Sequence, residues 1–186
     1  NLADAGMVQL FLGSVVSGLS TNDKIYSQET LNGALEADDG FGHALAAGDI
    51  EGDGIDYLVV GIWKEDIGSD VNAGAVQVLM GTQGAAGPSN TFGPIITQDN
   101  SQVIGTAAGG DRFGQNVLLA DLDNDGYDDL IVGSPRDVII GGGAVVDNGG
   151  GVNVLFSNGT DISFVNDLYF TASNIGDRFG FSITAG

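Results

Sequence analysis

The sequence predicts an all-β fold built from a repeated unit of about four antiparallel strands. First, residues 110–114 (Gly-Asp-Arg-Phe-Gly) recur at 176–180, and a weaker copy stands at 38–42, so the motif returns about every 70 residues. Second, short apolar runs bounded by turn residues occur throughout, without any sustained helical periodicity. Third, glycine supplies 32 of the 186 residues, well above its usual share, which suits tight turns between short strands.

Each unit is expected to begin with the Phe–Gly strand and to continue through an acidic loop into an apolar strand. The acidic loops begin at Asp49 and Asp121, each eight residues after the phenylalanine of its unit. The runs that follow, Leu-Val-Val-Gly at 58–61 and Leu-Ile-Val-Gly at 130–133, are typical of strands that are buried on both faces.

A Val-x-Val strand comes third in the unit, and a variable segment then leads to the next unit. Residues 76–78 and 152–154 alternate between apolar and polar, which predicts strands with one buried face. Four strands at this period match a blade of a β-propeller. We therefore expect one propeller-like domain or segment over residues 1–186, with two full units and partial units at both ends. Its expected parts are a partial blade at 1–36, blades at 37–108 and 109–174, and the first strand of a further blade at 175–186.

The second acidic loop, residues 121–129, predicts a calcium site. Five aspartates in nine residues repel one another unless a cation neutralises them. Ca²⁺ accepts roughly six to eight oxygens with loose geometry, whereas Mg²⁺ demands a stricter octahedron. Gly126 at position 6 permits a sharp turn, and an EF-hand is excluded because position 12 is a valine and the flanks are predicted strands. The expected ligands are the side chains at positions 1, 3, 5 and 9 and the backbone carbonyl at position 7: Asp121, Asp123, Asp125, Asp129 and Tyr127.

The first acidic loop, residues 49–57, predicts a second and weaker calcium site. Its expected ligands are Asp49, Glu51, Asp53 and the backbone carbonyl of Ile55. Position 9 is Tyr57 rather than an aspartate, so we expect lower affinity or a water in place of the missing carboxylate. The alternative for either loop is a solvated acidic turn without a metal, and two copies in register count against it.

Composition limits the possible partners. The chain has 25 acidic and 5 basic residues, a net charge of −20, which excludes nucleic acid as an expected partner because phosphate contacts require Lys and Arg. It has no cysteine and a single histidine, His43, and no apolar run approaches the length of a membrane helix, so membrane insertion is not expected. Arg112 and Arg178, which each follow an aspartate, are expected to pair with nearby carboxylates. Trp63 is expected to pack between units.

The Phe–Gly pair, the D-x-[D/E]-x-D-G loop and an apolar strand ending in Gly-Ser-Pro at 133–135 together resemble the FG-GAP repeat. The resemblance covers almost the whole chain. It implies blades of the seven-bladed propeller found in integrin α subunits and related prokaryotic surface proteins, with Ca²⁺ bound in the loop between the first two strands. The first unit departs from this pattern at 61–63, which read Gly-Ile-Trp.

Two functions are compatible with these observations. The first is an extracellular or cell-surface calcium-binding module for adhesion or ligand binding, with a structural Ca²⁺ and a protein or glycan ligand. The alternative is a structural subunit of an extracellular filament or surface assembly, a homo-polymer in which copies of the chain complete one another's blades. An enzyme is not expected, because the sequence has neither a nucleophile elbow nor a phosphate loop, and no catalytic partner is spaced around His43.

Overall fold

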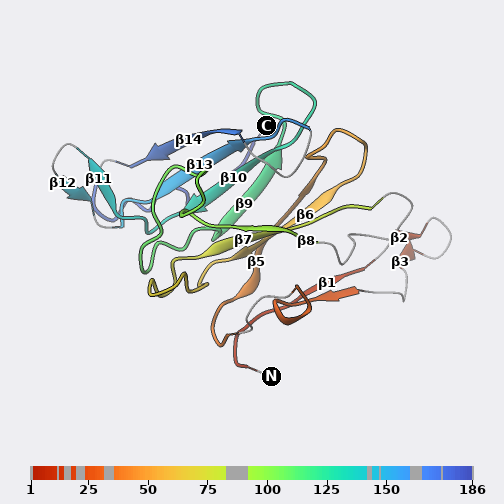
Figure 1. Cartoon of the computed structure of the whole chain (residues 1–186), viewed down its shortest axis with the longest axis horizontal. Helices are drawn as coiled ribbons and strands as arrows, with labels where there is room; N and C mark the ends of the chain where they lie inside the picture. The colour runs from red at the N-terminus through yellow and green to blue at the C-terminus, as the bar shows by residue number, and fades with distance from the viewer. Residues whose placement is uncertain are drawn as a thin grey trace.

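The computed structural model describes residues 2–11, 13–14, 18–19, 24–31, 36–82, 92–141, 144–146, 148–159, 165–172 and 174–185. Two four-stranded antiparallel sheets dominate this part of the chain (Figure 1). The one helical element described is a short 3₁₀ turn, η1, at Glu29–Leu31. None of the described segments forms a helix with the length and apolar character needed to cross a bilayer. The predicted all-β fold of four-stranded antiparallel blades is confirmed.

Within each four-stranded sheet the strands are ordered as they are in the sequence, so neighbouring strands are consecutive or are separated by one small hairpin. The first sheet has the order β5 (Phe41–Gly48), β6 (Tyr57–Ile62), β7 (Ala75–Leu79) and β8 (Phe92–Ile96). The second has the order β9 (Asn116–Ala120), β10 (Asp129–Ser134), β13 (Gly151–Phe156) and β14 (Val165–Thr171). The hairpin β11 (Ile139–Gly141) and β12 (Ala144–Val146) lies between β10 and β13 in the chain. In the N-terminal segment β1 (Val8–Leu10) pairs with β4 (Lys24–Tyr26), and β2 (Gly13–Ser14) pairs with β3 (Gly18–Leu19).

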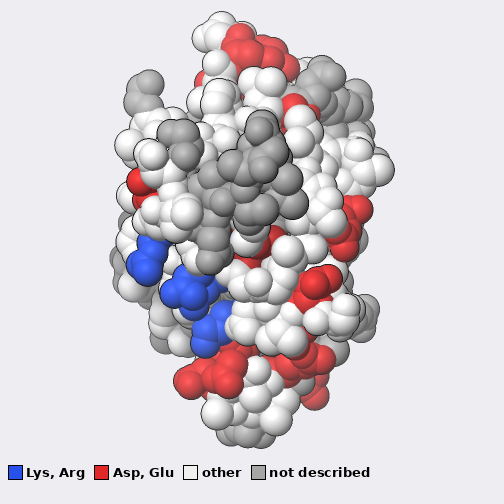
Figure 2. All heavy atoms as spheres, turned by 90° about the vertical axis from the view of Figure 1, so that its left-hand side faces the viewer, with Lys and Arg blue, Asp and Glu red and all other residues white. Residues whose placement is uncertain are grey.

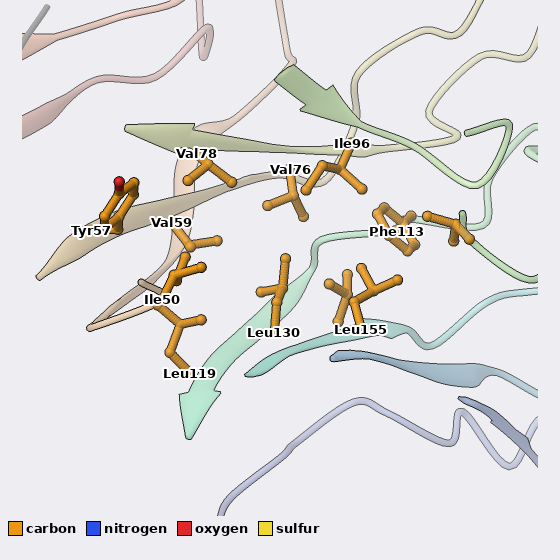
Figure 3. Packing of buried hydrophobic residues seen from close by; sticks show 12 residues of the cluster. Ile50, Tyr57, Val59, Val76, Val78, Ile96, Phe113, Leu119, Leu130 and Leu155 are labelled. Atoms are coloured by element: carbon orange, nitrogen blue, oxygen red, sulfur yellow. The ribbon is translucent and has the colours of Figure 1, made fainter. Parts of the chain in front are cut away.

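The main core lies between the two sheets, whose first strands β5 and β9 are adjacent (Figures 1 and 3). Val59 of β6 faces this core, whereas Val60 faces the opposite cluster, which includes residues of β1 and β4. In the same way Leu130 of β10 faces the main core and Ile131 faces outward into a third cluster. Both apolar runs are therefore buried on both faces, as their sequences predict.

The expectation that the Val-x-Val strands have one buried face is wrong. Gln77 in β7 is 3% exposed and Asn153 in β13 is fully buried. The Gln77 Nε2 donates a hydrogen bond to the carbonyl oxygen of Gly93 at 2.8 Å, and the Asn153 Nδ2 donates to that of Ile104 at 2.8 Å. The polar residue on each strand is buried because its amide group bonds a neighbouring segment instead of water.

The Phe–Gly motif holds consecutive units together through the backbone. Phe113 forms a parallel bridge with Gly74, and its N–H donates to the carbonyl oxygen of Ala73 at 2.9 Å. Gly74 has a φ of +90°, and a Cβ there would lie 2.2 Å from the Phe113 carbonyl oxygen. The same close approach joins Gly6 to Phe41 and Gly150 to Phe179. The glycine that precedes each Val-x-Val strand is thus required by contact with the next unit.

Candidate metal centre

The two acidic loops connect the first two strands of their sheets, and they turn at the same positions. The first loop runs from β5 to β6 and the second from β9 to β10. Left-handed backbone occurs at positions 4 and 6 of both loops, at Gly52 and Gly54 in the first and at Asn124 and Gly126 in the second. Glycine and asparagine are the residues that adopt this conformation at least cost. The repeated sequence therefore produces a repeated backbone conformation.

In the second loop, carboxylates at positions 1 and 5 organise the backbone. The Asp125 N–H donates to Asp121 Oδ1 at 3.1 Å, and the Gly126 N–H donates to Asp121 Oδ2 at 3.0 Å. Asp125 Oδ1 in turn accepts from the Tyr127 N–H at 3.0 Å. The two bonds to Asp121 draw the loop around its side chain, and the bond from Tyr127 to Asp125 is that of an Asx turn.

The first loop repeats this network residue for residue. Asp49 Oδ1 accepts from the Asp53 N–H at 3.1 Å, and Asp49 Oδ2 accepts from the Gly54 N–H at 2.7 Å. Asp53 Oδ1 accepts from the Ile55 N–H at 3.0 Å. Both loops are thus held in one conformation by their own carboxylates.

The second loop brings three of its expected ligands together. Carboxylate oxygens of Asp121, Asp123 and Asp129 all lie within 4.8 Å of one another, and Asp125 falls outside this group. Three converging carboxylates with no cationic side chain among them repel one another, and their hard oxygens fit a divalent cation such as Ca²⁺. The donor set therefore matches the predicted ion, whereas ligation by Asp125 and by the Tyr127 carbonyl stays a prediction.

Asp129 is the buried member of the group. It is fully buried at the first position of β10, where Oδ2 accepts from the Leu122 N–H at 2.9 Å and Oδ1 accepts from the Ser157 N–H at 3.0 Å. Burial raises the pKa of Asp129, these two hydrogen bonds oppose the increase, and the charges of Asp123 and Asp125 add to it. Asp129 therefore links the acidic loop to strand β10 within the candidate site.

The first loop has no equivalent of Asp129. Its position 9 is Tyr57, whose ring is buried in the main core, and Asp56 beside it is exposed. Among the described residues, Asp49, Glu51 and Asp53 do not form a converging acidic group like that of the second loop. This geometry is compatible with a weaker first site, and the order of affinities and the role of the Ile55 carbonyl stay predictions.

Sequence reasoning missed the contact that joins the two loops. The Asp49 N–H donates to Asp128 Oδ2 at 2.8 Å, and the Asp128 N–H donates to the Asp49 carbonyl oxygen at 2.9 Å. The ring of Tyr127 lies against Gly52, where a Cβ would come within 2.7 Å of it. Loop spacing within one unit carries no signal for this contact, because it depends on how neighbouring units pack.

Sequence reasoning also missed pairs of neighbouring carboxyl groups that lie where consecutive units contact each other, which we call the joints between units. Asp111 is fully buried, and Asp137, which is 6% exposed, accepts from Gln98 Nε2 at 2.8 Å. Burial, followed by the charge of Asp137, raises the pKa of Asp111 to about 7. At the preceding joint Gln28 Nε2 donates to Glu65 Oε2, and burial, followed by the charge of Asp39, raises the pKa of Glu65 to about 7.

Comparison with known proteins agrees with this geometry. Residues 113–152, which run from Phe113 through the second acidic loop into β13, match the model of the FG-GAP repeat. The chain is 34% identical over 99 residues to integrin alpha ina-1 of Caenorhabditis elegans, an alignment that covers 49% of this chain and 8% of that protein. It is 34% identical over 98 residues to human integrin alpha-IIb, covering 51% of this chain and 9% of that protein. The chain thus spans less than a tenth of the length of these relatives.

Proposed function

We propose that this chain, which carries an FG-GAP repeat and resembles integrin α subunits, is a calcium-stabilised β-propeller module for adhesion or ligand binding outside the cell or at its surface. The observation that carries the proposal is the convergence of Asp121, Asp123 and Asp129 in a repeat that is similar to integrin α sequences. The ligand is a protein or a glycan, and the role is binding rather than catalysis.

The calcium ion has a structural role in this proposal. Bound at the second loop, it supplies positive charge among carboxylates that otherwise repel one another. Asp121 and Asp123 would hold it from the loop and Asp129 from β10, so that the ion fixes the loop to the sheet. With a dissociation constant of about 10⁻⁴–10⁻³ M, 1 mM Ca²⁺ adds about 0.4–1.4 kcal/mol to stability at each site. The 49–55 ligands form the weaker site.

Calcium titration calorimetry and thermal unfolding, with and without chelator, test this proposal. We expect Ca²⁺ to raise the unfolding midpoint and chelator to reverse the increase. Asp129→Asn removes the stronger site, whereas Asp56→Asn, the same change of charge at an exposed residue of the first loop that is not an expected ligand, leaves both sites intact. Absence of binding heat together with a chelator-insensitive midpoint would show that the loops are solvated acidic turns.

A second candidate function is self-assembly, and exposed apolar side chains on the outer units favour it. Met7 and Phe11 are exposed near the start of the chain, and Phe170, Ile175 and Phe181 are exposed near its end. We propose that such faces are covered by further blades, including those of other copies of this chain in a homo-polymer. Light scattering after size exclusion in millimolar Ca²⁺ tests this candidate: a large, regular assembly supports it and a compact monomer refutes it.

A further inference from the structure

Four of the five Lys and Arg side chains of this acidic protein lie near one another. Arg136 and Arg178 line the same pocket, and Arg112 lies close enough to both for their charges to lower its pKa, after burial as the main cause. Arg112 and Lys64 both lie over the ring of Trp63, at 4.4 and 4.8 Å from its centre. We call Lys64, Arg112, Arg136 and Arg178 the basic cluster. Figure 2 shows Lys and Arg side chains grouped on one face, with acidic residues around them.

The basic cluster lies at the end of the second sheet opposite the acidic loop. Arg112 precedes β9 and Arg136 follows β10, whereas residues 121–128 connect these two strands at the other end. The antiparallel register agrees, because it pairs Asn116 with Gly133 at one end and Ala120 with Asp129 at the other. The cluster is therefore separate from the candidate metal centre.

The expected pairing of Arg112 and Arg178 with carboxylates is not seen with any carboxylate that the structure describes. Within the described part of the chain, no member of the basic cluster forms an ion pair, and the Nε of Arg112 is buried without a hydrogen-bond partner. Like charges held together cost free energy, and none of the described carboxylates forms an ion pair with them to offset it. The cluster thus has the capacity to bind an anion from outside.

The surroundings of Trp63 indicate a locally positive potential. His43 stacks on the indole ring with 4.5 Å between ring centres. Burial lowers the pKa of His43, and the charges of Arg112 and Lys64 lower it further. The ring of Trp63 is therefore occupied by His43 and by two cations, which leaves it poorly placed to stack against a sugar.

A pocket of about 560 Å³ adjoins the cluster, lined by Arg136, Asn148, Ile175, Gly176 and Arg178. This volume lies within the range of small-ligand pockets, and the pocket is widely open to solvent. Each guanidinium presents a planar fork of N–H donors that fits a carboxylate with two parallel hydrogen bonds. The apolar side chain of Ile175 can contact the aliphatic part of a bound Asp or Glu.

We propose that the basic cluster and its pocket bind a peptide segment of a protein partner that presents one or two Asp or Glu carboxylates among neutral or basic residues. This inference rests on the proposed ligand-binding function and specifies the chemistry of the ligand. The net charge of −20 repels extended polyanions such as sulfated polysaccharides at long range. At physiological salt, screening over about 8 Å lets an isolated carboxylate respond mainly to the cluster.

The test uses the fact that all three arginines of the chain belong to the cluster. In the whole chain with Ca²⁺, NMR spectra of the arginine Nε–H groups therefore report on this surface alone. The probe is the peptide Lys-Ser-Glu-Glu-Ser-Lys, and its control carries two glutamines in place of the glutamates. We expect saturable shifts of these signals with the glutamate peptide and binding of the control at least about tenfold weaker.

For the double variant R136Q/R178Q, which lacks two of the three reporter groups, binding is followed by the backbone amide signals instead. These should show no saturable shift with the glutamate peptide, whereas K24Q, which removes one positive charge outside the cluster, should bind as the unchanged chain does. R178Q alone, at an exposed side chain, serves if the double variant does not fold. Equal responses to both peptides, a response retained in the variant, tighter binding of a heparin oligosaccharide, or shifts that follow protein concentration alone would each overturn the proposal. Calcium titration of the same sample separates the outcomes: calcium binding without peptide binding refutes this inference and leaves the proposed calcium module standing.

Discussion

Replacing Phe113 with alanine should destabilise the chain far more than the same change at Phe179, although both residues occupy the same Gly-Asp-Arg-Phe-Gly motif. Phe113 is fully buried between the two sheets, so its loss removes apolar contacts and leaves a cavity, at a cost of about 3–5 kcal/mol. Phe179 is 44% exposed, and solvent fills the space it leaves, so we expect a cost of about 1 kcal/mol. The difference, about 2–4 kcal/mol, is a large fraction of the stability of a typical domain.

Urea unfolding of both variants in saturating Ca²⁺, followed by the fluorescence of Trp63, measures this difference. Trp63 is the single tryptophan and lies beside Arg112, so its emission reports on the joint that Phe113 occupies. The dependence of free energy on urea should stay the same in both variants, so that midpoints can be compared directly. Equal costs at the two positions would refute the reasoning, because they would show that the motif contributes the same energy whether its phenylalanine ring is buried or exposed.

Three further predictions concern the joints between units. The free energy of unfolding should fall as pH rises from about 4 to about 7, because the pKa of Asp111 is raised from 3.8 to about 7 and the folded chain keeps a proton that the unfolded chain has released. Urea unfolding across this range should show a weaker pH dependence of that free energy for Asp111→Asn, and an unchanged pH dependence would contradict the assignment. Gly61→Ala places a Cβ 2.1 Å from the carbonyl oxygen of Gly114 and should lower the free energy of unfolding in urea by about 1–3 kcal/mol. Gly13→Ala, with open space around the added atom, should leave that free energy unchanged. Asp128→Ala removes the hydrogen bond to the first acidic loop and should lower the free energy of unfolding by about 1 kcal/mol. The calcium affinity of the second loop, measured by calorimetry, should stay unchanged, and loss of that site would show that Asp128 is a ligand.

The local parts of the fold could be predicted because each depends on residues close together in the chain. The apolar runs at Val59 and Leu130 identify strands buried on both faces without knowledge of what covers them. The burial of Asn153 could not be predicted in this way, because its amide group bonds Ile104, which lies 49 residues away. A polar residue in an alternating run indicates a solvent-facing side chain only when no other segment of the chain forms hydrogen bonds with that side chain.

In the candidate metal centre, too, the features that depend on local spacing could be predicted and the contacts between units could not. The turns of both acidic loops follow from spacing, because the hydrogen bonds that the carboxylates at positions 1 and 5 accept all link residues within five positions of each other. The convergence of Asp129 with Asp121 also follows from spacing, since the next strand begins at a fixed distance. The roles of Asp128 and of the arginines arise between units, where the sequence of one unit carries no information about its neighbour.

The three Phe–Gly motifs show why a sequence repeat does not give equal energies. Phe41 and Phe113 are buried by strands on both sides, whereas Phe179 retains its backbone bond to Gly149 but is largely exposed. The backbone bond is thus present at Phe179 without burial of the ring, so the motif's two contributions to stability are separable. The stability of this chain therefore depends strongly on the contacts between consecutive units, as in other repeat proteins. The acid pairs and the contact between Asp49 and Asp128 stand at these joints too, so the energetic effects of calcium and pH should be felt most strongly where two complete units meet.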